Sequence, residues 1–152
     1  MAIRYFALIA GAVFALVGLL GFVPGINVEG PPNAPPVTVS SFYGHLLGLF
    51  AVNLVHNVVH LAIGAWGIFA YSRGIWSSRM FARGLTILYV ILGVMGFIPN
   101  FNTLFGLAPL YGHDVWLHLL TAAIAAYFGF FHRVGMRDHV EDRAEHLVHG
   151  HH

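Results

Sequence analysis

Four long apolar stretches, separated by shorter polar ones, follow one another along the 152-residue chain. They cover residues 5–23, 44–71, 80–98 and 113–131, and each reaches the roughly 20 residues that a membrane-spanning helix needs. The second stretch is longer than this minimum, so we expect it to tilt or to project beyond the bilayer. The pattern predicts an all-α integral membrane protein, a bundle of four transmembrane helices.

Composition supports this prediction and narrows the possible chemistry. Hydrophobic residues make up 58% of the chain and charged residues only 9%, whereas a soluble domain carries about 25% charged residues. The net charge of +1 provides no basic patch for nucleic acid. The absence of cysteine excludes disulfides, thiolate metal sites, iron–sulfur clusters and cysteine nucleophiles.

Arginine placement predicts the orientation of the spans. The seven basic residues precede the first span, surround the turn between the second and third spans, and follow the fourth. Loops 25–43 and 99–112 contain neither lysine nor arginine. Because basic loops stay on the cytoplasmic side, we expect both termini to be cytoplasmic in an inner, cytoplasmic-type membrane. No small-x-small cleavage site follows the first span, so we expect it to be retained rather than removed as a signal peptide.

The chain also shows an internal repeat. A shift of 75 residues aligns the first span with the third, and a shift of 58 residues aligns the second with the fourth. The second alignment sets His60 on His118 and His56 on Asp114. Both predicted hairpins begin on the same side, so we expect two tandem parallel repeats, related by an axis along the membrane normal.

Ionisable groups at membrane depth are costly and therefore mark functional candidates. His60 and His118 lie 13 and 15 residues before the arginines that follow their spans. At about 1.5 Å per residue, both lie at a similar depth, roughly 20 Å from the cytoplasmic edge. His56 and Asp114 lie one turn further out, on the same helix faces. If the second and fourth spans face each other, three imidazoles and one carboxylate converge, which is a plausible ligand set for Zn, Cu or non-haem Fe.

Other interpretations of these residues remain open. Asn53, Asn57 and Tyr111 lie close enough in sequence to support metal ligands by hydrogen bonds. His60 and His118 could instead be the two axial ligands of a single haem, or one histidine could ligate a chlorophyll-type pigment. Histidine and asparagine also join membrane helices by hydrogen bonds that are worth about 0.6 kcal/mol each, with no ligand involved.

Residues 132–152 form a tail of different character. This tail is rich in histidine, and apolar residues recur at helical spacing between Met136 and Val148. The spacing predicts an amphipathic helix on the cytoplasmic face of the membrane.

Several short motifs carry a family resemblance. They are Gly-Phe-x-Pro at residues 21–24 and 96–99, Val-Asn-x-x-His-Asn-x-x-His-Leu at 52–61 and Asp-x-x-x-His at 114–118. Residues 2–131 thereby resemble a bacterial family of four-span membrane proteins that is catalogued only as a domain of unknown function. Val115 departs from the asparagine that usually follows the family's aspartate. The resemblance implies the fold and the topology and supplies no activity.

Two functions follow as hypotheses. The first is a ligand-binding membrane protein that holds a transition metal or one haem in the histidine and aspartate cluster. The second is a non-enzymatic accessory subunit of a larger photosynthetic or respiratory membrane complex, with or without direct contact to pigment. The motifs of serine hydrolases, phosphate loops, dinucleotide-binding folds and zinc proteases do not occur, so we assign no catalytic residue.

Overall fold

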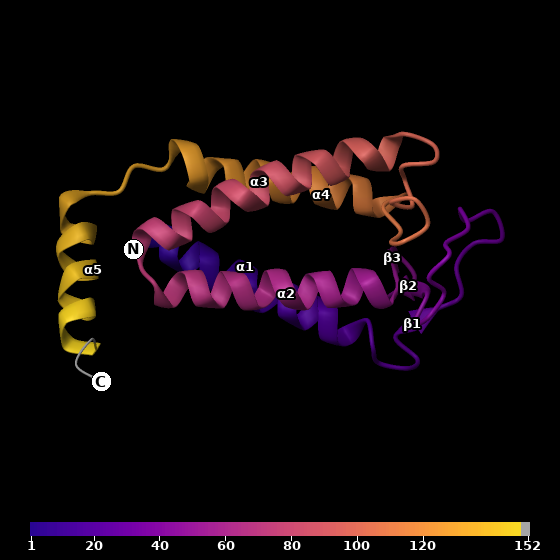
Figure 1. The fold of residues 1–152 in the computed structure, drawn as a ribbon, viewed down its shortest axis with the longest axis horizontal. Helices are drawn as coiled ribbons and strands as arrows, with labels where there is room; N and C mark the ends of the chain where they lie inside the picture. The colour runs from indigo at the N-terminus through magenta and orange to yellow at the C-terminus, as the bar shows by residue number, and fades with distance from the viewer. Residues whose placement is uncertain (150–152) are drawn as a thin grey trace.

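The computed structural model describes residues 1–149, without the side chains of residues 137, 141 and 145–149, and four long helices run side by side along it (Figure 1). These helices are α1 (Ala2–Leu20), α2 (Leu54–Ser72), α3 (Ile75–Phe97) and α4 (His113–Ala126), and a π-helical segment, η1 (Tyr127–Phe131), extends α4. Each of the four is long and apolar enough to cross a bilayer, counting α4 with η1. The prediction of four apolar helices long enough to span a membrane is confirmed, and the protein is mostly helical.

A small antiparallel sheet covers one end of the bundle, so the fold is not purely helical. Its strands are β1 (Asn27–Val28), β2 (Gly44–Leu46) and β3 (Phe50–Val52), in the order β1-β2-β3. The expected helical start of the second span at residue 44 is therefore wrong, because α2 begins only at Leu54. Leu47 and Gly48 have φ angles of 55° and 73°. These angles reverse the chain into a hairpin and are incompatible with a continuous helix.

Helices α1 and α2 pack extensively on each other, as do α3 and α4, and contacts between these two pairs are sparser. Glycines permit the close approach within the first pair. A Cβ atom built on Gly64 would lie 2.6 Å from the backbone nitrogen of Ala15 and 2.8 Å from the carbonyl oxygen of Gly11. Such small residues let membrane helices pack backbone to backbone.

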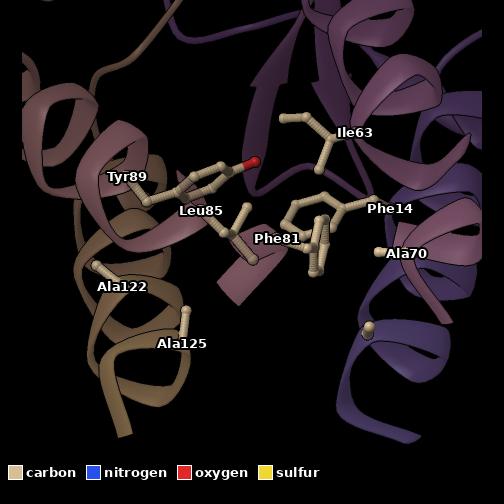
Figure 2. Packing of buried hydrophobic residues seen from close by; sticks show 9 residues of the cluster. Phe14, Ile63, Ala70, Phe81, Leu85, Tyr89, Ala122 and Ala125 are labelled. Atoms are coloured by element: carbon tan, nitrogen blue, oxygen red, sulfur yellow. The ribbon is translucent and has the colours of Figure 1, made fainter. Parts of the chain in front are cut away.

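The apolar core lies between the two helix pairs (Figure 2). Phe14 of α1 and Tyr89 of α3 meet there, with ring centroids 5.4 Å apart. Phe81 and Leu85 are fully buried beside them. On the outside of the bundle, large apolar side chains are exposed along all four helices. An apolar exterior of this extent suits lipid rather than water.

Helix α5 (Met136–His149) lies across the end of the bundle where the chain begins (Figure 1). The Asp142 carboxylate accepts a hydrogen bond from the Ile75 backbone nitrogen at 3.2 Å and pairs with Arg4 at 3.2 Å. The N-terminal ammonium group pairs with Asp138. Asp142 thus caps the start of α3, where Gly74 provides no side-chain cap. The predicted tail continues to residue 152, and its last three residues, with the side chains of Leu147 and Val148, lie outside the described part.

Candidate functional site

The four residues expected to converge do line one cavity. His56 and His60 come from consecutive turns of α2, and Asp114 and His118 from consecutive turns of α4. All four are buried, with exposed fractions of 2–8%. The ring centroids of His56 and His60 lie 4.4 Å apart. The i, i+4 spacing in each helix brings its two polar side chains to the same face, toward the other helix pair.

The cavity that they line, which we call the central cavity, has a volume of about 290 Å³. Its remaining walls are mostly apolar side chains of α1, α3 and α4: Phe6, Ile9, Ala10, Val13, Phe14, Val17, Leu85, Tyr89, Leu117, Thr121 and Ile124. A second cavity of about 200 Å³ lies on the other side of the histidines, against α3 and the loop before α4. His56, His60, His118 and Tyr89 line both cavities. These four rings therefore separate two apolar spaces.

The hydrogen bonds of the four polar residues differ. His56 Nδ1 donates to the carbonyl oxygen of Pro109 at 3.3 Å, because that oxygen can only accept. The Asp114 carboxylate accepts a hydrogen bond from the Ala51 backbone nitrogen at 3.1 Å. Within residues 1–149, the buried Nδ1 atoms of His60 and His118 have no hydrogen-bond partner. Two buried imidazole nitrogens are thus left unsatisfied by the described residues.

Aromatic rings fix the orientation of these two imidazoles. Phe14 meets the His60 ring edge-on, with centroids 5.3 Å apart. Tyr89 meets the His118 ring in the same way, at 5.0 Å. Figure 2 shows the Tyr89 ring reaching from α3 toward Phe14. Sequence reasoning missed Tyr89, although a tyrosine in the middle of an apolar span is itself a signal of a polar requirement.

A metal ion needs donor side chains that converge more closely than His56, His60, Asp114 and His118 do. Among the residues that the structure describes, no group of three histidine, aspartate or glutamate side chains is arranged to hold a metal ion. The Asp114 carboxylate is directed to the backbone of β3 by its hydrogen bond with Ala51. The metal and haem hypotheses therefore stay predictions.

Comparison with known proteins identifies the family. Residues 4–131 match the family described as Domain of unknown function (DUF4383). The chain belongs to this family. No curated protein and no solved structure matches the chain. The DUF4383 domain includes all four apolar helices and the central cavity and ends before α5, so the resemblance noted from the motifs is confirmed.

Three residues of the DUF4383 domain were expected to support metal ligands by hydrogen bonds, and each lies in a different environment: Asn53, Asn57 and Tyr111. Asn53 caps α2 by accepting a hydrogen bond from the His56 backbone nitrogen at 3.0 Å. Asn57 packs against Gly21, and neither polar atom of its buried side chain has a partner in the described part of the chain. The Tyr111 hydroxyl bonds with that of Tyr43. Burial, reinforced by this bond, raises the pKa of Tyr111, so its hydroxyl stays protonated at neutral pH.

Proposed function

We propose that this protein binds a membrane-dissolved molecule in the central cavity and that His60, His118 and Tyr89 hold its polar head group. The observation that carries the proposal is the pair of imidazoles, His60 and His118, that line a mostly apolar cavity and whose buried Nδ1 atoms have no partner among the described residues. A buried polar atom left unsatisfied costs about 1–3 kcal/mol. A ligand with hydrogen-bonding groups removes this cost, and its apolar part matches the remaining walls.

The size of the cavity narrows the ligand. Pockets for drug-sized molecules measure about 300–1,000 Å³, so the central cavity, at about 290 Å³, lies just below the lower limit of this range. A head group with a single ring fits this volume better than a four-ring porphyrin does. The rest of such a molecule would lie against the lipid-facing side of α1, where Val13 lines the cavity and is half exposed.

Two variants of α1 test this proposal. The protein is purified in mild detergent, extracted with organic solvent and analysed by mass spectrometry. Val13→Trp fills the central cavity, so the bound molecule should be lost. Leu16→Trp adds the same ring to an exposed position of the same helix that does not line the cavity, so binding should persist. Equal occupancy in the two variants, or no extractable molecule in the unmodified protein, would refute the proposal.

Substitutions at His60 test the role of the imidazole. His60→Phe keeps the ring volume and removes both nitrogens, so we expect occupancy to fall. His60→Gln restores a donor and an acceptor and should recover part of it. If both variants bind as the unmodified protein does, the imidazole takes no part in recognition.

A transition metal is the second candidate, favoured by the 4.4 Å between the His56 and His60 rings and by His118 on the wall of the same cavity. Binding of Zn, Cu or Fe would require these rings to move closer together. Elemental analysis and an absorption spectrum of the same preparation test for a metal, a single haem or a chlorophyll-type pigment. One metal ion per chain, lost in both His60→Ala and His118→Ala, would support this candidate over the first.

The remaining hypotheses also stay proposals. An accessory subunit of a photosynthetic or respiratory complex should co-purify with that complex in mild detergent, and a lone monomer under those conditions counts against it.

The proposed repeat is supported by equivalent contacts. Gly18 packs against Leu61 in the first hairpin and Gly93 against Leu119 in the second, at the shifts of 75 and 58 residues. The arginine-rich end is proposed to face the cytoplasm.

A further inference from the structure

A separate cavity of about 790 Å³ lies at the arginine-rich end of the bundle. We call it the end cavity, and it lies between the start of α3, the end of η1 and the first turns of α5. The residues that line it are Ile75, Trp76, Arg79, Phe130, Phe131, His132, Arg133, Val134, His139 and Asp142. It does not share any residue with the central cavity.

The end cavity carries a net positive charge. Arg79 and Arg133 both line it, and in the described part of the chain neither has a carboxylate partner. The one acidic side chain on its wall, Asp142, is already paired with Arg4 and bonded to the backbone of Ile75. Arg79 donates one hydrogen bond, to the carbonyl oxygen of His132 at 3.0 Å, which holds its guanidinium group in place. Among the side chains that the structure describes, no carboxylate neutralises Arg79 or Arg133.

The rim of the end cavity is aromatic and exposed. Trp76 and Phe131 have exposed fractions of 75% and 74%. Tryptophan is enriched where the hydrocarbon of a bilayer meets the head groups. The end cavity thus combines cationic walls with an aromatic rim at one end of the four apolar helices.

From this combination we infer that the end cavity binds the phosphodiester head group of an anionic phospholipid, with Arg79 and Arg133 on the phosphate and Trp76 and Phe131 against the upper acyl chains. Guanidinium groups bind phosphate oxygens through paired hydrogen bonds. Basic pockets between membrane helices on the cytoplasmic side accommodate such head groups. This site is independent of the ligand proposed for the central cavity.

Quenching of Trp76 by brominated lipid tests the inference. The full chain, with Trp66→Phe and Trp116→Phe so that Trp76 is the only tryptophan, is placed in phosphatidylcholine nanodiscs. These contain a minor fraction of either brominated phosphatidylglycerol or brominated phosphatidylcholine. We expect stronger quenching by the anionic lipid at equal mole fraction. Removing one arginine, in Arg79→Gln or Arg133→Gln, should lower this preference about fivefold.

Arg73→Gln is the matched control, because Arg73 is an arginine at the same end whose guanidinium lies over the Phe69 ring, outside the end cavity. It should keep the preference, whereas Arg79→Lys, which retains the charge without the paired hydrogen bonds of a guanidinium group, should keep only part of it. Equal quenching by the two lipids, or an equal loss of preference in Arg73→Gln, would overturn the inference. If excess inorganic phosphate abolishes the preference, the site binds free phosphate and the lipid assignment is wrong.

Discussion

Replacing Asn53 by alanine should destabilise the protein strongly, because this one side chain joins three segments. It is fully buried. Its Nδ2 donates to the carbonyl oxygens of Val39 and Leu107, at 2.9 Å and 2.8 Å, in the loops before β2 and before α4. Its Oδ1 accepts from the backbone nitrogen of His56 and so caps α2. Asn53 therefore links the start of α2 to the loops of both hairpins.

The magnitude follows from these three hydrogen bonds. Loss of a helix N-cap costs about 1 kcal/mol. A buried carbonyl oxygen left without its donor costs about 1 kcal/mol at the low end of the observed range. The low end applies because each carbonyl retains a second lone pair and both hydrogen bonds are only partly buried. With two such carbonyls, we expect Asn53→Ala to lower the free energy of unfolding by about 3 kcal/mol, and Asn53→Ser, which preserves the cap, by about 2 kcal/mol.

Unfolding in mixed micelles with increasing dodecyl sulfate, followed by circular dichroism, measures this loss. Asn57→Ala is the matched control, because Asn57 is equally buried one turn along α2 and its side chain makes no hydrogen bond in the described structure. It should cost less than about 1 kcal/mol, since no bond is broken. Equal destabilisation by the two substitutions would refute the hydrogen-bond argument. It would leave side-chain volume as the explanation.

Three shorter predictions concern other parts of the molecule. Gly64→Ala should destabilise by about 1–3 kcal/mol in the same assay, because its Cβ would collide with the α1 backbone, whereas Ala65→Val, on the exposed side of α2, should have little effect. Asp142→Asn should increase amide hydrogen exchange in α5 by weakening its pairing with Arg4, without changing exchange in the middle of the four spans. Burial lowers the pKa of His45 in the folded protein. At acidic pH the unfolded chain therefore binds more protons than the folded one, and the stability of β2 should fall as the pH drops below about 6.5. Amide exchange in β2 should rise at acidic pH, and His45→Phe should remove that dependence.

The four helices could be predicted from the sequence because each depends on a local property. An apolar stretch of about 20 residues satisfies its backbone hydrogen bonds internally, so its length and composition suffice. The i, i+4 spacing placed His56 with His60, and Asp114 with His118, on one face, and the similar depth in the bilayer placed the two pairs at one level. The spacing and the depth depend only on helix geometry. The convergence of the four residues on one cavity depended further on the second and fourth spans facing each other.

The sheet could not be predicted in this way, because residues 44–52 are apolar enough to continue a helix. A short apolar stretch does not distinguish a buried strand from a buried helix. The chain forms a hairpin here because Leu47 and Gly48 adopt left-handed backbone conformations. Glycine adopts such a conformation readily, whereas leucine does not favour it. The side chain of Asn53 then starts the helix, a role that its position inside the apolar stretch concealed.

The unpartnered nitrogens were equally invisible in the sequence, because they depend on distances between helix pairs. A metal site requires donors that meet within a few tenths of an ångström of ideal geometry. Residue spacing along one helix sets the position of its own side chains and leaves the separation from the next pair undetermined. Tyr89, from a third helix, enters the site through packing against Phe14 and His118 that no motif records.

Under the proposed function, the division of the bundle into two helix pairs separates the residues that stabilise the fold from those that would bind the ligand. Glycines such as Gly64 and Gly93 bring the helices of each pair into close contact, and substitutions there should act on the stability of the fold. The imidazoles of His60 and His118 lie instead where the two pairs face each other across sparser contacts. A ligand that enters between the pairs gains its hydrogen bonds without disturbing the packing within either pair. Occupancy of the central cavity should therefore raise the resistance of the two pairs to separation more than the stability of either pair by itself.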